Sequence, residues 1–160
     1  MSPGLVDRRQ FVCAGAAFAA LLQARGASAA TTTSLSIKVY KDPSCGCCSA
    51  WVARLEAAGF VSTVEDRSDM SAIKASLGVP DNLASCHTGV IDSYTIEGHV
   101  PPDDIKRLLA SRPKAKGLAV PGMPVNSPGM EMPGAPSAPY TVWLFHGDGK
   151  RTTAFARHGT

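Results

Sequence analysis

Three cysteines stand within four residues of one another early in the sequence. Cys45, Cys47 and Cys48 follow a proline-containing turn and lead directly into a pattern of apolar residues typical of a helix. A cysteine at a helix N-terminus faces unpaired backbone N–H groups and the positive end of the helix dipole, which favours the thiolate. Cys45 and Cys48 also have the C-x-x-C spacing that thiol–disulfide exchange uses. The cluster predicts thiol or metal chemistry, with Cys45 and Cys48 as the catalytic pair if the site is redox-active.

Cys47 is the residue that complicates a simple redox motif. Three thiolates in four residues repel one another, and a soft cation such as Cu(I) removes that repulsion because closely spaced sulfurs can bridge it. Zn(II) is an alternative, since it also accepts thiolate and imidazole ligands. A plain stabilising disulfide and an iron–sulfur site are two further alternatives, and the crowded spacing disfavours the iron–sulfur site.

Cys86 and His87 are the predicted second half of the site, because they stand directly before a β-rich run. In thioredoxin-like folds the segment before the third strand lies against the active-site helix. His99 is a further candidate ligand. His146 and His158 are expected at the surface.

Two methionines complete the predicted set of soft ligands. Met123 and Met130 belong to two Pro-Gly-Met repeats, at 121–123 and 128–130. A thioether suits Cu(I), and an irregular loop could fold over an exposed site. The alternative is that these methionines only anchor the loop on the surface.

The elements that must position these residues alternate between strand and helix patterns. The order β-α-β-α-β-β-α, with a cysteine-bearing helix N-terminus and a closing hairpin, predicts a thioredoxin-like α/β fold with a central mixed β-sheet flanked by helices. Segment 117–139 is expected to form a long irregular loop rich in proline, glycine and methionine. The strands are expected at 35–40, 60–65, 88–91, 94–97, 140–145 and around Phe155, and the helices at 48–58, 69–77 and 102–112.

The first 29 residues are predicted to be an export signal. Arg8 and Arg9 form a twin-arginine start, an apolar run follows at 11–22, and small residues at 27–29 supply a cleavage site. Residues 30–160 would then form a single thioredoxin-like metal-binding domain in the periplasm. The alternative is an uncleaved anchor helix.

Composition is that of an ordinary globular protein: 160 residues, 44% hydrophobic and 18% charged. Removal of 1–29 takes away Asp7 and three arginines and leaves 13 basic and 12 acidic residues, so the apparent basic balance belongs partly to the signal. We therefore expect no nucleic-acid partner. No later apolar run is long enough to cross a membrane, so no membrane association is expected after cleavage. In an oxidising compartment the four remaining cysteines should be disulfides, metal ligands or both.

Four motifs in the same order resemble the CopG family, periplasmic proteins that accompany copper-resistance operons. The resemblance spans residues 35–146 and implies a thioredoxin-like fold, copper at the cysteine cluster, and other periplasmic copper-resistance proteins as partners. It implies Cys45, Cys47, Cys48 and Cys86 as thiolate ligands, and it matches His87, His99, Met123 and Met130 to motif positions. Ser93 departs from the family, whose hairpin usually carries glycine there. The motifs are Asp42-Pro43-Ser44-Cys45-Gly46-Cys47-Cys48 with Trp51, Ser85-Cys86-His87-Thr88, Glu97-Gly98-His99-Val100-Pro101, and Gly117-Leu118-Ala119-Val120-Pro121-Gly122-Met123-Pro124.

Two functions follow as hypotheses. The first is a periplasmic copper-binding protein of copper resistance, which binds one or more Cu(I) ions at the Cys-x-Cys-Cys cluster and as an oxidoreductase interconverts Cu(I) and Cu(II). The second is a thiol–disulfide oxidoreductase that uses Cys45 and Cys48 and meets metal only incidentally.

Overall fold

The computed structural model describes residue 1, residues 35–136 and residues 138–159. The predicted export signal at 2–29 lies outside these described residues. Within them, no helix is long and apolar enough to span a bilayer. The elements are β1 Ser36–Lys41, α1 Gly46–Ala57, β2 Val61–Asp66, α2 Met70–Ser76, a 3-10 turn Asp81–Leu83, β3 His87–Ile91, β4 Tyr94–Gly98, α3 Pro102–Ser111, β5 Gly117–Val120, β6 Tyr140–Phe145 and β7 Thr152–His158.

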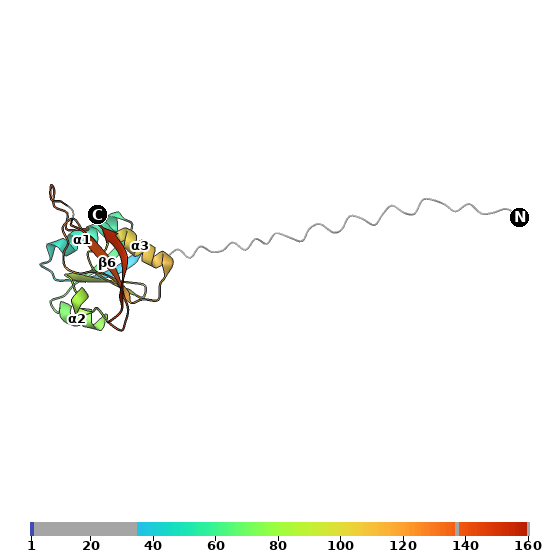
Figure 1. Ribbon diagram of the computed structural model, residues 1–160, viewed down its shortest axis with the longest axis horizontal. Helices are drawn as coiled ribbons and strands as arrows, with labels where there is room; N and C mark the ends of the chain where they lie inside the picture. The colour runs from blue at the N-terminus through green and yellow to red at the C-terminus, as the bar shows by residue number, and fades with distance from the viewer. Residues whose placement is uncertain (2–34, 137, 160) are drawn as a thin grey trace. The chain divides into compact units, whose positions relative to one another are not determined.

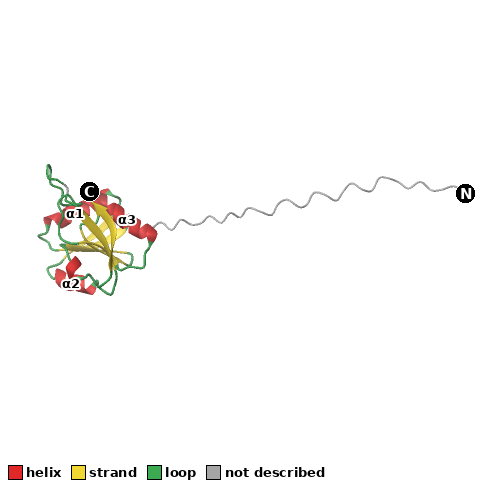
Figure 2. Ribbon diagram, in the orientation of Figure 1, coloured by secondary structure: helices red, strands yellow, loops and turns green. Residues whose placement is uncertain are grey.

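In the described part of the chain, seven strands form one mixed sheet in the order β2-β1-β3-β4-β5-β6-β7. The pairs β1–β2 and β4–β5 are parallel, and the other four pairs are antiparallel. Helices α1 and α3 lie on one side of the sheet and α2 on the other (Figures 1 and 2). The predicted α/β class with a mixed sheet flanked by helices is confirmed.

The strand directions bring distant parts of the sequence to one edge of the sheet. Strands β1, β4 and β5 run the same way, so their last residues, Lys41, Gly98 and Val120, lie at the same end. The first residue of β3, His87, pairs with Lys41 and starts at that end as well. The chain segments that leave or enter these strands carry the predicted ligands.

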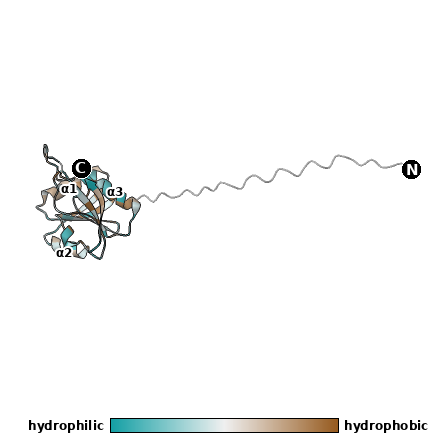
Figure 3. Ribbon diagram, viewed as in Figure 1, coloured by the Kyte–Doolittle hydropathy of each residue, from teal (hydrophilic) through white to brown (hydrophobic). Residues whose placement is uncertain are grey.

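The main core lies between the sheet and helices α1 and α3. Helix α1 buries Cys48, Trp51, Val52 and Leu55, which recur at helical spacing, and Gly59 with φ 91° follows its end. Figure 3 shows hydrophilic and hydrophobic residues together on α3, as a helix with one buried face requires. The buried residues of this core are Ile37, Val39, Trp51, Val52, Leu55, Phe60, Ile91, Tyr94, Ile96, Val100, Ile105, Leu108, Leu109, Leu118, Val120 and Val142.

The hairpin of β3 and β4 forms where it was predicted, although Ser93 stands where glycine was expected. Asp92 takes the positive φ of the turn, 50°, so the turn does not need a glycine at position 93. Aspartate tolerates this left-handed conformation better than most residues do. The departure therefore leaves the hairpin unchanged.

The prediction of an irregular segment from residue 117 is wrong for its first four residues. Gly117–Val120 is a fully buried strand that pairs in parallel with β4. A Cβ atom at Gly117 would collide with the backbone of Thr95, so only glycine permits this close approach of the two strands. The dense prolines that follow masked a short Gly-Leu-Ala-Val strand. In the described residues of 121–139, no helix or strand occurs.

Candidate metal centre

The cysteine motif forms the start of α1. The carbonyl oxygen of Asp42 accepts a hydrogen bond from the Cys45 N–H at 3.0 Å, and its carboxylate accepts one from the Ser44 N–H at 2.8 Å. This turn places Cys45 at the N-cap position, with Cys47 and Cys48 in the first helical turn. All three sulfurs therefore lie at the positive end of the helix dipole.

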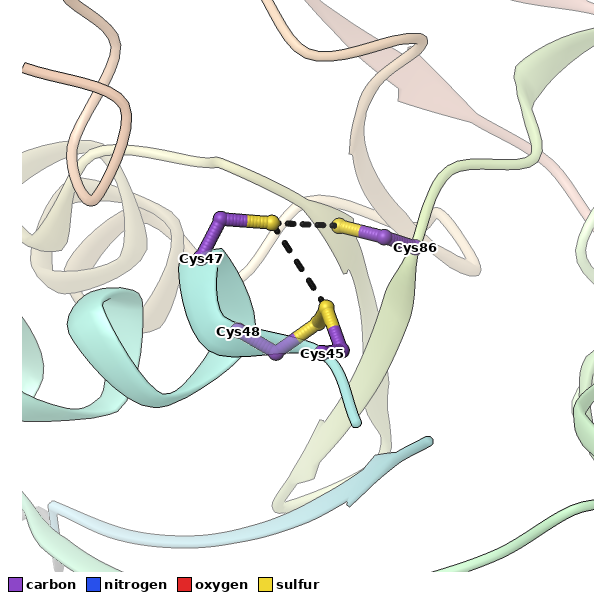
Figure 4. Close-up of side chains that lie close together, drawn as sticks. All are labelled: Cys45, Cys47, Cys48 and Cys86. Atoms are coloured by element: carbon purple, nitrogen blue, oxygen red, sulfur yellow. Dashed lines mark hydrogen bonds between the residues drawn. A yellow bond between two sulfur atoms is a disulfide. The ribbon is translucent and has the colours of Figure 1, made fainter. Parts of the chain in front are cut away.

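Four sulfur atoms converge at this helix end (Figure 4). Cys45 and Cys48 form a disulfide, whereas Cys47 and Cys86 are free thiols. The Sγ atom of Cys47 lies 3.5 Å from Sγ of Cys45 and 4.0 Å from Sγ of Cys86. The tertiary fold thus brings Cys86, 39 residues downstream, beside the motif.

Cys86 also belongs to a second group of donors. Its Sγ lies 3.2 Å from Nδ1 of His87 and 3.2 Å from Nε2 of His99. The ligand atoms of the four cysteines lie within 4.8 Å of one another, and so do those of Cys86, His87 and His99. Cys86 therefore joins a sulfur cluster to a pair of imidazoles.

The orientation of His99 is set by the proline-rich loop. Its Nδ1 lies 2.8 Å from the carbonyl oxygen of Pro128, which can only accept a hydrogen bond. Nδ1 therefore carries the proton and Nε2 presents its lone pair towards Cys86. A hydrogen bond from the ring nitrogen that does not bind the metal is how proteins fix the tautomer and the ring orientation of a histidine ligand.

The ring of His87 is buried between aromatic neighbours. Its centroid lies 4.3 Å from that of Trp51 and 5.0 Å from that of His99. Trp51 is held in turn, because its indole N–H donates to the carbonyl oxygen of Val100 at 2.9 Å. The Nε2 atom of His87 is buried and has no hydrogen-bond partner among the described residues. Trp51 is a positioning residue that sequence reasoning did not assign a role in the site.

Burial favours the neutral forms of Cys86, His87 and His99. It raises the pKa of the Cys86 thiol to about 11, with the nearby Cys47 sulfur as the next cause. It lowers the pKa of His87 well below the usual 6.5, helped by His99 and Lys74, and it also lowers the pKa of His99. Neutral imidazole is the form that binds a metal, and a bound cation would displace the Cys86 proton.

The shifted pKa of His87 predicts loss of stability of the metal-free protein at acid pH. Well above pH 6.5, His87 is neutral in both folded and unfolded states. As the pH falls through 6.5, the imidazole of His87 becomes protonated in the unfolded state but stays neutral in the folded state, which favours unfolding. Between pH 6.5 and 5, we expect this residue to reduce the free energy of unfolding by about 1 to 2 kcal/mol. Urea unfolding at both pH values measures the change.

The control for this titration is His87→Gln, which keeps a polar side chain of intermediate size but has no group that titrates in this range. Its pH dependence between 6.5 and 5 should be clearly shallower than that of the native chain. Equal slopes in the two proteins would show that His87 does not cause the effect.

A buried charged network holds the Cys86 segment. Glu97 is fully buried in β4, and its carboxylate accepts hydrogen bonds from the Ser85 N–H, Lys74 Nζ and Thr88 Oγ1, each at 2.6 Å. Lys74 also donates to Thr88 Oγ1 at 3.0 Å. Sequence reasoning did not assign Glu97 a role. Glu97 falls with Thr95 on the polar phase of an alternating strand, so no local pattern marked it as buried.

The proline-rich loop is fixed to the site at three further points. Ser85 Oγ donates to the Gly122 carbonyl oxygen at 2.6 Å, and Glu131 pairs with Arg54 of α1 at 2.8 Å. A Cβ atom at Gly129 would lie only 2.6 Å from the backbone N of Trp51, so this glycine packs directly on the helix that carries the cysteines. These contacts place the loop against both α1 and the Cys86 segment.

The structure brings six of the eight predicted ligands together, namely the four cysteines, His87 and His99. Met123 is exposed and Met130 is half-buried in the loop, and both stay predicted ligands. His158 is not the free surface residue that was expected. It is half-buried, its ring stacks on Tyr140 with centroids 5.1 Å apart, and its Nε2 lies 2.7 Å from Asp104.

The fold and the site together define an α/β protein with a thiol- and imidazole-rich cluster at one edge of its sheet. A family described as "Protein of unknown function, DUF411" matches residues 83–130. A comparison with curated proteins gave no match.

Two solved structures are similar over most of both chains. "Copper resistance protein copG- Form 1" is 46% identical with a TM-score of 0.74 and covers 79% of this chain and 99% of its own. "Copper resistance protein copG- Form 2" is 46% identical with a TM-score of 0.72 and covers 77% and 97%. The chain belongs to the CopG family.

Proposed function

We propose that this protein binds Cu(I) in copper resistance, with Cys45, Cys47, Cys48 and Cys86 as thiolate ligands and His87 and His99 as imidazole ligands. One observation carries the proposal: Cys86 is common to both donor groups, so four sulfurs and two ring nitrogens meet around one residue. Thiolate is the ligand that selects Cu(I), and imidazole suits copper as well. Zn(II), which also accepts thiolate and imidazole ligands, is the alternative metal.

The cluster can bind more than one Cu(I), because a thiolate can bridge two ions and four sulfurs lie within 4.8 Å of one another. Met123 and Met130 are proposed as additional thioether ligands from the loop. The loop is anchored on both sides of the cluster, which supports this assignment.

The disulfide supports a redox role for the same site. Oxidation of the Cys45 and Cys48 dithiol to the observed disulfide releases two electrons and two protons. Two Cu(II) ions that accept those electrons become two Cu(I) ions, which Cys47 and Cys86 are placed to receive. The protein would in this way act as a copper oxidoreductase.

The stoichiometry of Cu(I) binding tests the proposal. Fully reduced protein, titrated anaerobically, should bind more than one Cu(I). Cys47→Ser should lower the number of Cu(I) ions bound by at least one, because the Cys47 sulfur contacts the sulfurs of both Cys45 and Cys86. Ser49→Ala, an exposed change on the same helix, is the matched control and should leave the number unchanged. Unchanged stoichiometry in Cys47→Ser would show that Cu(I) does not bind at the cysteine cluster as proposed.

A second candidate function is thiol–disulfide exchange with other proteins through Cys45 and Cys48. The strand order β2-β1-β3-β4 with α1 and α3 on one face favours a thioredoxin-like arrangement for residues 36–111, and the disulfide at the start of α1 fits it. This function predicts reduction of a disulfide-bonded protein substrate that depends on Cys45 and survives Cys47→Ser. Copper binding would then be incidental.

We place this activity in the periplasm, after export by the twin-arginine route and removal of residues 1–29. The Arg8-Arg9 pair supports the route, and the copper resistance named for the two solved relatives supports an extracytoplasmic role. Other periplasmic copper-resistance proteins are the proposed partners.

A further inference from the structure

We propose that the four cysteines form an internal disulfide relay, in which one disulfide moves between Cys45–Cys48 and Cys47–Cys86. The relay goes beyond copper binding and does not depend on it, because every reacting atom belongs to the chain. It also gives Cys47 and Cys86 a chemical role that the simple Cys45–Cys48 redox pair does not contain.

The distances set the order of the reacting sulfurs. Sγ of Cys47 is in contact with the disulfide, 3.5 Å from Sγ of Cys45. Sγ of Cys86 lies 4.0 Å from Sγ of Cys47 and within 4.8 Å of the two disulfide sulfurs. Figure 4 shows the same contacts, with dashed lines from Cys47 to Cys45 and to Cys86. Cys47 is therefore a thiol in contact with both the disulfide and the second thiol, Cys86.

The first step is attack of the Cys47 thiolate on Sγ of Cys45. The Cys45–Cys47 bond forms, the Cys45–Cys48 bond breaks, and Cys48 leaves as a thiolate that takes up the proton which Cys47 lost. The start of α1 favours this step, because backbone N–H groups at a helix N-terminus stabilise a thiolate on either residue. The new bond joins cysteines two residues apart and closes a small ring, so we expect it to be short-lived.

The second step is attack of the Cys86 thiolate on Sγ of Cys47. The Cys47–Cys86 bond forms, the Cys45–Cys47 bond breaks, and Cys45 leaves as a thiolate that takes up the proton from Cys86. One disulfide and two thiols are present before and after both steps. The exchange is an isomerisation and needs no outside oxidant or reductant.

Burial decides which of the four sulfurs an outside molecule can reach. Cys48 is completely buried, whereas Cys45, Cys47 and Cys86 are partly exposed. A thiol from solution therefore cannot reach Cys48 directly. The relay regenerates a Cys45 and Cys48 dithiol without contact between Cys48 and any outside molecule.

The position of the disulfide decides which donors are free. With Cys45–Cys48 closed, the Cys86 thiol stays with both imidazoles. With Cys47–Cys86 closed, Sγ of Cys86 is no longer a free thiol beside the imidazoles. Cys45 and Cys48 are then the two free thiols in place of Cys47 and Cys86. The relay would thus switch the metal-binding set of the protein without a change in its overall oxidation state.

Disulfide mapping of metal-free protein tests the relay. Reduced protein is given oxidant for one disulfide, held without oxygen, denatured with N-ethylmaleimide and digested with trypsin. Cys45–Cys48 stays inside the peptide 42–54, whereas Cys47–Cys86 joins that peptide to peptide 75–106. We expect both forms in the native chain, with the joined form at about a tenth of the total or more, and only Cys45–Cys48 in Cys47→Ser. Ser49→Ala should give the native distribution.

Two results would overturn the relay. Native protein that holds Cys45–Cys48 alone, however long it equilibrates, would show that no exchange occurs. A Cys45–Cys86 link that forms in Cys47→Ser as fast as the joined form appears in native protein would show that Cys47 is not the attacking sulfur. Since no metal is present, neither result bears on Cu(I) binding, and a failed copper titration leaves the relay standing.

Discussion

Cys86→Ser is expected to abolish tight Cu(I) binding even in the protein whose Cys45–Cys48 disulfide is closed. In that state the remaining thiol and imidazole donors are Cys47, Cys86, His87 and His99, and Cys86 contacts both histidines and lies next to Cys47. Loss of a residue that only orients a ligand weakens metal binding about 10- to 100-fold, so loss of this shared ligand should exceed about 100-fold. Competition with a Cu(I) chelator of known affinity measures the change.

Ser49→Ala is again the matched control, because it changes an exposed side chain near the cysteines and should bind Cu(I) as the native chain does. Circular dichroism of both variants shows whether the fold is intact. If folded Cys86→Ser competes for Cu(I) within a fewfold of the native protein, Cys86 is not the common ligand and the two donor groups act separately.

Glu97→Gln is expected to cost about 3 to 5 kcal/mol of folding free energy, because removal of one partner of a buried ion pair leaves the other charge without compensation. The carboxylate is fully buried and lies 2.6 Å from Nζ of Lys74, whose side chain is only 12% exposed. A glutamine there also turns an NH₂ donor towards at least one of three hydrogen-bond donors. Urea unfolding of the metal-free protein gives the free energy.

The same substitution at Glu65 is the matched control. Glu65 pairs with Lys38 at 2.7 Å and with Arg67 at 3.0 Å, but these groups are largely exposed, so Glu65→Gln should cost far less. Glu97→Gln should also weaken Cu(I) binding, because the Ser85 N–H that fixes the Cys86 segment loses a charged acceptor. Equal losses of stability at positions 65 and 97 would contradict the assigned role of the buried network.

Local patterns in the sequence were enough to predict the order of the elements from β1 to α3 and the cysteine cluster at the start of α1. The helix periodicity after Cys48 and the alternating strand patterns depend on neighbouring residues, and the structure has these elements within a few residues of the predicted bounds. The C-x-C-C spacing places three cysteines within one helical turn of the chain, because one turn takes about 3.6 residues. The sequence could therefore predict a sulfur cluster without knowledge of the fold.

The strand Gly117–Val120 shows where local patterns fail. Four residues are too few to show a strand pattern, and the prolines that follow favour an irregular segment. These residues form a strand because they pair in parallel with β4. The close approach of Gly117 to Thr95 is a contact across 22 residues. A contact of that range has no trace in the local spacing of apolar residues.

The shared position of Cys86, the role of His99 and the buried network of Glu97 were decided only by the tertiary structure. These residues come from β3, β4 and the segments next to them, and they meet the start of α1 because β1 and β4 end at the same edge of one sheet. The Pro128 carbonyl that selects the His99 tautomer is 29 residues away along the chain. The amino-acid sequence by itself determined that three cysteines stand together at the start of α1, because residues a few positions apart on one helix stay close in space. The sheet determined which sulfur and which imidazoles complete the site, because strand pairing alone brings distant residues within bonding distance.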